Sequence, residues 1–257
     1  MSKQKLESYL QAQMNDGKNL FVPYIVAGDH GFDHLKETIT FLEDCGVSAI
    51  ELGIPFSDPV ADGPTIQVAG KKALDQGVSL RAVLDFLAEF TERTIPIVLM
   101  TYVNPVFAYG IEAFAKRCEE VNVSGVIIPD VPMEEDSLVT TSLQQHNIAF
   151  IRLAALTSTE DRIEQITKQS EGFLYAVSVT GTTGARTNHE KRVFNYLHNL
   201  KEKSKVAVLA GFGVSTPEQA KELGHACDGV IVGSKIVDLI DQNDFDAIRQ
   251  LIHKSMS

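Results

Sequence analysis

The feature that most constrains the fold of this chain is a regular alternation between short apolar runs and longer segments with helical spacing. The short runs are β-branched or continuously apolar, which suits strands that are buried on both faces of a parallel sheet. Eight such runs occur, at Phe21–Ala27, Ala49–Ile54, Pro96–Thr101, Gly125–Ile128, Ile148–Leu153, Phe173–Val177, Val206–Leu209 and Gly229–Val232. Between them, apolar residues recur at helical intervals, as in Leu35–Leu42 and Leu80–Phe90. The pattern predicts an α/β chain in which each strand is followed by a helix.

Helix start signals support the same order. Thr216-Pro217 reads as an N-cap followed by proline at the first helical position, and Ser158–Asp161 opens another helix with acidic residues in its first turn. An extra helix is expected at Ser2–Gln13. No Pro/Gly/Ser-rich linker divides the chain. We therefore expect residues 1–257 to form a single (β/α)8 barrel domain with an extra N-terminal helix, and a doubly wound open sheet is the alternative.

The charge balance narrows the possible partners. A net charge of −11 argues against a nucleic-acid or anionic-membrane binder, which needs clustered Lys and Arg. A small anionic substrate remains compatible, because a local nest of backbone N–H groups can bind it. No apolar run approaches the roughly 20 residues of a membrane span, and the N-terminus has no signal-peptide pattern. The expected location is the cytoplasm.

The chain has three widely spaced cysteines, Cys45, Cys118 and Cys227. Their number is odd, and no CxxC or similar metal-ligand spacing occurs. We expect them to be small buried residues in a reducing compartment, and we expect no metal site.

The most unusual segment is residues 51–64, ELGIPFSDPVADGP. Glu51 lies inside an apolar run, so a carboxylate there must be paired, neutralised or directed into a cavity. The loop that follows carries three prolines, and Pro55 and Pro59 restrict the backbone around Asp58. Asp62 stands just before a potential helix at Thr65–Leu74, and local sequence alone favours a helix N-cap at this position.

Three glycine-containing segments follow the last three predicted strands: 178–184 (SVTGTTG), 210–215 (AGFGVS) and 232–234 (VGS). Glycine lets backbone N–H groups approach an anion, and a helix that starts at Ser234 adds a favourable dipole. Barrels often bind phosphate with their last loops. The segment 178–190 is long, polar and Gly/Thr-rich, which is typical of a closing lid.

Seven blocks of the chain, in order, resemble the tryptophan synthase alpha chain family. They are PYIVAGD (23–29), ELGIPFSDPVADGP (51–64), LMTYVNP (99–105), IIPDVP (127–132), FLYAVSVTGTTGAR (173–186), GFGVSTPEQA (211–220) and VIVGSKIV (230–237). The second block is long enough to be highly specific.

The resemblance implies a role for each matching residue. Glu51 is similar to the family's general acid/base and Asp62 to its second catalytic carboxylate, which replaces the N-cap interpretation. The remaining residues are Tyr175 lining the catalytic site, Thr183 and Gly184 on the lid and phosphate side, Gly213, Gly233 and Ser234 at the phosphate, Tyr24 in the indole pocket, and Pro55 and Asp58 facing a beta subunit. Tyr24 replaces a phenylalanine found in some members, and Thr182 a common valine.

The reaction that the resemblance implies is the retro-aldol cleavage of indole-3-glycerol phosphate to indole and glyceraldehyde 3-phosphate, in tryptophan biosynthesis. It implies no cofactor on this chain and a beta partner that carries pyridoxal phosphate, in an alpha2-beta2 assembly to which indole is passed. The apolar surroundings of Glu51 are expected to raise its pKa, as a group that both gives and takes protons requires.

Two other classes of function are compatible with the residues. Another phosphate-binding barrel enzyme, such as a sugar-phosphate isomerase or aldolase, would share the late glycine loops. A Schiff-base aldolase would need a lysine at a strand end, and Lys205 and Lys235 stand in no convincing site. The non-enzymatic alternative is a barrel that only activates a beta partner. The presence of Glu51, Asp62 and Tyr175 together argues against it.

Overall fold

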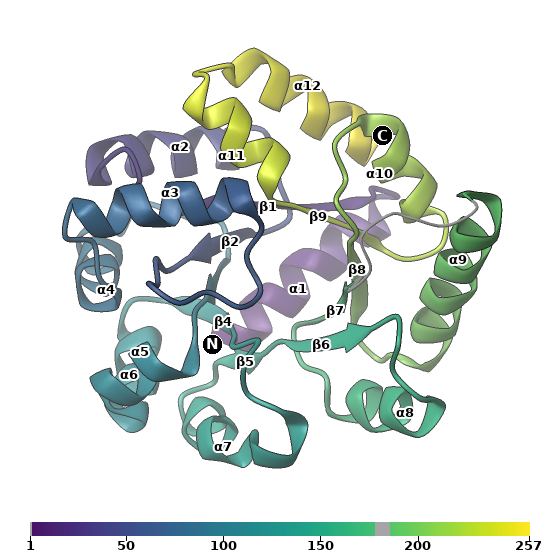
Figure 1. The fold of residues 1–257 in the computed structure, drawn as a ribbon, viewed down its shortest axis with the longest axis horizontal. Helices are drawn as coiled ribbons and strands as arrows, with labels where there is room; N and C mark the ends of the chain where they lie inside the picture. Colours follow the sequence, from purple (N-terminus) through teal and green to yellow (C-terminus); the bar gives the residue numbers. More distant parts are fainter. Residues whose placement is uncertain (1, 178–185) are drawn as a thin grey trace.

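The strands form one parallel sheet that closes into a barrel. The structure is a computed structural model that describes residues 2–177 and 186–257. Within those residues the strand order is β5-β4-β3-β2-β1-β9-β8-β7-β6, and every pairing is parallel. The edge strands β5 and β6 are separated only by Ile151, so the chain itself joins the two edges of the sheet (Figure 1). The predicted barrel is confirmed, and an open doubly wound sheet is excluded.

All eight predicted strand runs form strands. Their bounds are β1 Leu20–Val26, β2 Ile50–Gly53, β3 Ile97–Met100, β4 Val123–Ile127, β5 Ala149–Phe150, β6 Arg152–Ala155, β7 Phe173–Val177, β8 Ala207–Gly211 and β9 Gly229–Val232. The fifth predicted run is divided into β5 and β6. The division has a simple cause: β5 pairs with β4 on one side, whereas β6 pairs with β7 on the other.

Helices surround the barrel in Figure 1. They are α1 Ser2–Asn15, α2 Phe32–Asp44, α3 Pro64–Asp75, α4 Leu80–Glu89, α5 Val103–Tyr109, α6 Ile111–Glu120, α7 Ser137–Gln145, α8 Glu160–Gln169, α9 Arg186–Lys203, α10 Pro217–Gly224, α11 Ser234–Asp241 and α12 Phe245–Met256, with a short 3-10 helix η1 at Met133–Glu135. The predicted caps are present. Thr159 accepts a hydrogen bond from the N–H of Arg162, and Thr216 forms a capping box with Gln219.

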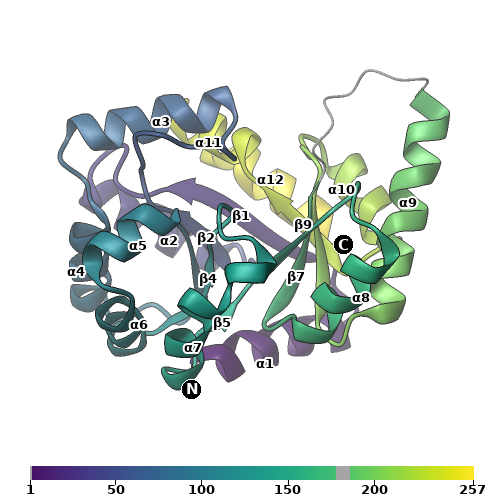
Figure 2. The same ribbon diagram turned by 60° about the horizontal axis from the view of Figure 1, so that its bottom comes forward.

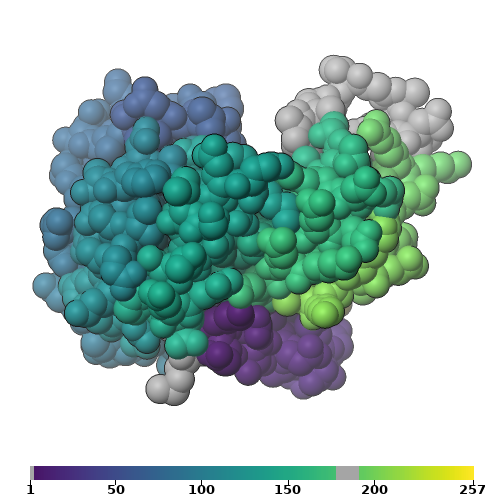
Figure 3. All heavy atoms as spheres, turned by 90° about the horizontal axis from the view of Figure 1, so that it is seen from below, coloured from purple at the N-terminus to yellow at the C-terminus, as the bar shows by residue number. Residues whose placement is uncertain are grey.

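Helix α1 covers the end of the barrel at which the strands begin (Figures 2 and 3). Its buried Leu6 packs against Gly172, which directly precedes β7. The side chain of Gln13, also in α1, donates a hydrogen bond to the carbonyl of Gly46, which precedes β2. Because α1 occupies this end, the loops that can hold a substrate lie at the other end, where the strands finish.

The barrel interior is apolar around a small polar group of residues. Paired residues of neighbouring parallel strands lie on the same face of the sheet. Tyr24 pairs with Glu51 between β1 and β2, and Leu153 pairs with Tyr175 between β6 and β7. Among the described residues, no helix is both long enough and apolar enough to span a membrane.

Candidate active site

Glu51 is a carboxyl group buried in the barrel. It lies in β2 between apolar neighbours, is only 3% exposed, and its Oε2 atom has no hydrogen-bond partner among the described residues. Burial, with a smaller contribution from the Asp62 carboxylate, raises the pKa of Glu51 to about 8. A buried carboxyl with a pKa near neutrality can both donate and accept a proton, which fits general acid/base chemistry. The expected pKa shift of Glu51 is therefore present.

Asp62 lies on the loop between β2 and α3, close enough to Glu51 for their charges to interact. The helix that follows begins at Pro64 with Gly63 as its N-cap, and no side chain caps it. The N-cap interpretation of Asp62 is therefore wrong, because Gly63 occupies the N-cap position and Asp62 lies one residue before it, outside the helix. Burial raises the pKa of Asp62, and hydrogen bonding with Tyr102 acts in the opposite direction.

Two tyrosines, Tyr24 in β1 and Tyr175 in β7, accompany Glu51 and Asp62. Burial raises the pKa of Tyr24 well above its usual value, and the charges of Asp62 and Glu51 raise it further. Tyr175 is affected in the same way by burial and by Glu51. Tyr24 also lies directly against β2, since a β-carbon placed on Gly53 would lie 2.1 Å from its hydroxyl oxygen. The predicted site residues Glu51, Asp62, Tyr24 and Tyr175 thus lie together.

The predicted phosphate residues lie at the ends of β8 and β9. Gly213 has a φ of +67°, a conformation that L side chains rarely adopt. Gly233 is the N-cap of α11 and Ser234 its first residue, as predicted. A β-carbon on Gly233 would lie 3.7 Å from Cβ of Tyr24, so the start of α11 lies next to Tyr24. Helix geometry leaves the N–H groups of Ser234 and Lys235 without an intrahelical acceptor, which is the arrangement that binds anions.

The loop that carries Asp62 reaches the surface in its middle. Asp58 is exposed, whereas Pro55 is buried within the chain. Val60, between Asp58 and Asp62, is 78% exposed, an unusual exposure for an apolar side chain. The expected lid and phosphate-side residues Thr183 and Gly184, together with Thr182, lie outside the described residues.

The residues that the structure describes include no group of three or more His, Cys, Asp or Glu side chains placed to hold a metal ion. Cys45, Cys118 and Cys227 are buried free thiols, as predicted.

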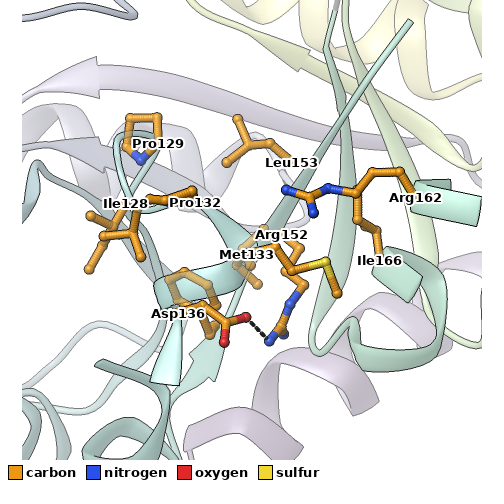
Figure 4. Close-up of a pocket in the computed structure, with 12 residues that line it drawn as sticks. Ile128, Pro129, Pro132, Met133, Asp136, Arg152, Leu153, Arg162 and Ile166 are labelled. Carbon is orange, nitrogen blue, oxygen red and sulfur yellow. Dashed lines mark hydrogen bonds and ion pairs between the residues drawn. The ribbon is translucent and has the colours of Figure 1, made fainter. Parts of the chain in front are cut away.

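A separate cavity of about 180 Å³ lies in the outer layer, between the loop after β4, strand β6 and helix α8 (Figure 4). Its charged side chains are already paired. Arg152 donates to Asp136 at 2.5 Å and to the carbonyl of Gln169 at 2.6 Å, and Arg162 forms an ion pair with Glu134. Arg152 therefore links α7 and α8 to the barrel. The cavity is lined by neither Glu51 nor Asp62.

Tyr102 is a site residue that sequence reasoning did not single out. It is 1% exposed, and its hydroxyl contacts the loop that carries Asp62. The residue stands in the block LMTYVNP, directly after a predicted strand, so its position at a strand end was the available signal.

Comparisons with known proteins agree with this geometry. The sequence profile of the family described as "Tryptophan synthase alpha chain" matches residues 10–256. A tryptophan synthase alpha chain from Oceanobacillus iheyensis is 59% identical over 257 residues, covering 100% of this chain and 98% of the relative. One from Bacillus cereus is 48% identical over 245 residues, 95% of each chain.

Solved structures give the same result. Tryptophan synthase subunit alpha from Legionella pneumophila superposes with a TM-score of 0.87 at 31% identity, covering 98% of this chain and 96% of that one. A chain in the crystal structure of tryptophan synthase from M. tuberculosis also gives a TM-score of 0.87, at 29% identity, covering 97% and 96%.

Proposed function

This chain belongs to the tryptophan synthase alpha chain family, and we propose that Glu51 and Asp62 carry out its reaction, the cleavage of indole-3-glycerol phosphate to indole and glyceraldehyde 3-phosphate. The observation that carries the proposal is the buried carboxyl of Glu51, with an unpartnered oxygen and a pKa of about 8, beside a second carboxylate. The enzyme is a carbon–carbon lyase of tryptophan biosynthesis.

The reaction breaks the bond between indole C3 and the glycerol side chain. Indole is a poor leaving carbanion, so C3 must be protonated before the bond breaks. Protonated Glu51 gives its proton to C3, and positive charge develops on the ring nitrogen. Ionised Asp62 accepts a hydrogen bond from the ring N–H and stabilises that charge; such a bond to a charged group is worth about 1.5–3 kcal/mol.

Bond cleavage then restores the starting state of the enzyme. Glu51, now ionised, removes the proton of the side-chain hydroxyl adjacent to C3. The C–O bond becomes the aldehyde carbonyl, the electron pair of the broken C–C bond returns to the indole ring, and Glu51 is protonated again. Substrate and products contain the same atoms, so the reaction needs no external oxidant or reductant, and we assign no cofactor to this chain. General acid/base catalysis of this kind contributes roughly 10²–10⁴-fold.

The substrate phosphate is assigned to backbone N–H groups at the start of α11 and at Gly213. Support comes from the positive φ of Gly213 and from Gly233 at the N-terminus of α11, next to Tyr24. With this assignment the phosphate lies beside Tyr24, and its binding needs no Lys or Arg side chain. Tyr24 and Tyr175 would then contact the indole ring.

The partner of this chain is a beta subunit, in an alpha2-beta2 assembly to which indole is passed, and pyridoxal phosphate is assigned to that partner. The exposed Asp58 and Val60 support a contact at the loop between β2 and α3. We assign the enzyme to the cytoplasm.

Indole release from indole-3-glycerol phosphate tests the proposal. The purified chain should form indole and glyceraldehyde 3-phosphate in equal amounts, and adding a beta subunit should increase the rate. Cleavage of other sugar phosphates without indole release would support the alternative barrel enzymes. No product with or without the beta subunit would overturn the proposal.

A further inference from the structure

The side chain of Tyr102 holds the loop between β2 and α3 at two points. Its ring stacks on Phe56 near the start of the loop, with centroids 5.0 Å apart and an interplanar angle of 28°. Its hydroxyl accepts a hydrogen bond from the backbone N–H of Ala61, at 3.1 Å, near the end. Figure 1 shows this loop running across the front of the barrel, near the start of α5. One buried residue therefore fixes the path of a partly exposed loop.

The second contact also orients the hydroxyl proton. A phenol has a single proton, and the oxygen of Tyr102 is already the acceptor for Ala61. Its proton is therefore free for another acceptor, and the carboxylate of Asp62, the residue after Ala61, lies near enough to raise the pKa of Tyr102. An ionised carboxylate can only accept. A hydrogen bond between the two groups therefore runs from Tyr102 to Asp62, and donors in such a chain strengthen one another.

Tyr102 is itself anchored from the neighbouring loop. It is the N-cap of α5 but supplies no capping hydrogen bond. Instead, the carboxylate of Asp130, on the loop after β4, accepts the N–H of Val103 at 3.0 and 3.2 Å. The backbone on both sides of Tyr102 is therefore held, by β3 before it and by Asp130 after it.

We propose that Tyr102 is a positioning residue for the lyase reaction, which holds the loop at Phe56 and Ala61 so that the Asp62 carboxylate is aimed at the indole N–H. The proposal rests on the function proposed above for Asp62. The titratable groups that face Asp62 are Tyr102, Tyr24 and Glu51. Only Tyr102 lowers the pKa of Asp62, while burial raises it. Loss of the Tyr102 hydroxyl should raise the pKa of Asp62, so less of it is ionised at low pH.

The test compares Tyr102→Phe with Tyr109→Phe. Both variants lose one phenol hydroxyl, Tyr102 at the start of α5 and Tyr109 at its end. Phenylalanine keeps the ring that stacks on Phe56, so we expect both variants to fold. In the complex with a beta subunit, Tyr102→Phe should lower kcat for indole release at least about tenfold with little change in KM, the size of a lost charge-assisted hydrogen bond. The deficit should grow as the pH falls, since the raised pKa of Asp62 in the variant leaves less of the carboxylate ionised. Tyr109→Phe should behave like the parent.

A double-mutant cycle with Asp62→Asn identifies the route of the effect. If Tyr102 acts through Asp62, adding Tyr102→Phe to Asp62→Asn should cause little further loss of kcat. Additive losses, or a Tyr102→Phe variant with the kcat and pH profile of Tyr109→Phe, would overturn the positioning role. If instead the parent releases no indole, the proposed function itself fails. The two failures are therefore distinguishable.

Discussion

The ring of Tyr175 lies directly over Gly211: a β-carbon placed on Gly211 would lie 2.3 Å from Cε2 of Tyr175 and 2.9 Å from its hydroxyl oxygen. No real β-carbon tolerates such a contact, so any larger residue at Gly211 must displace the tyrosine ring. Gly211 pairs with Val177, at the end of β8. The absence of a side chain at this position thus sets the place of an aromatic group beside Glu51.

We therefore predict that Gly211→Ala lowers indole release by about tenfold or more, since small displacements at a reacting centre are costly. Gly70→Ala is the matched control, because a β-carbon on Gly70 in α3 meets nothing within 4 Å. Steady-state kinetics of both variants provide the measurement. Parent-like activity of Gly211→Ala would show that the position of Tyr175 is unimportant.

A second prediction separates the two interpretations of Asp62. Asp62→Asn should reduce turnover strongly while leaving thermal stability nearly unchanged, because the Asp62 side chain does not cap α3. Ser79→Ala is the contrasting variant: Ser79 caps α4 by accepting the N–H of Ala82, and its loss should cost about 1 kcal/mol of stability. An active Asp62→Asn protein with a loss of stability like that of Ser79→Ala would restore the capping role.

The pH dependence of stability gives a third prediction. The pKa of Glu51 is raised from 4.5 to about 8 in the folded chain. Between these values the folded state keeps a proton that the unfolded state releases, so this contribution to stability is lost as the pH rises towards 8. Glutamine does not titrate. The free energy of unfolding of Glu51→Gln, relative to the parent, should therefore increase from about pH 5 to about pH 8.

Urea unfolding at the two pH values measures this difference. Glu89→Gln, at an exposed glutamate, is the control and should show a flat difference. A flat difference for Glu51→Gln as well would mean that the carboxyl is not shifted in the folded chain.

The fourth prediction concerns the partner. Asp58 is exposed and lies four positions before Asp62 on one loop, whose ends are held by Tyr102. A contact at Asp58 can therefore bias the position of Asp62, if the partner favours one state of the loop. We expect Asp58→Ala to reduce the activation by a beta subunit while leaving the activity of the isolated chain unchanged. Indole release across a beta-subunit titration measures it, and identical activation of parent and variant would exclude coupling through this loop.

The fold could be predicted from sequence because its signals are local and repeated. Each buried parallel strand appears as a continuous apolar run, and caps such as Thr159 and Thr216 mark the helix starts. The division of the strand around Ile151 was not predicted, because it depends on which neighbours each half pairs with. Such pairing is a property of the closed barrel.

The residues of the site differ in how clearly the sequence alone identified them. Glu51 was visible because a carboxyl in an apolar run violates the local pattern. The role of Asp62 was ambiguous, because an aspartate just before a helix is also typical of an N-cap. The resemblance to a family indicated the catalytic role instead. Tyr102 carried no such conflict, because a tyrosine at a strand end is unremarkable in sequence. Its importance arises from contacts with Phe56 and Ala61, which only the folded loop brings together.

The most direct test of the proposed mechanism is the turnover of Glu51→Gln in the complex with a beta subunit, measured together with its affinity for indole-3-glycerol phosphate. Glutamine keeps the shape of the side chain but can no longer exchange a proton. We predict a fall in kcat of at least about 100-fold, the lower end of general acid/base catalysis, with nearly unchanged substrate affinity. A kcat within about threefold of the parent value, at equal affinity, would contradict the assignment of Glu51, because loss of an acid/base group should lower kcat far more.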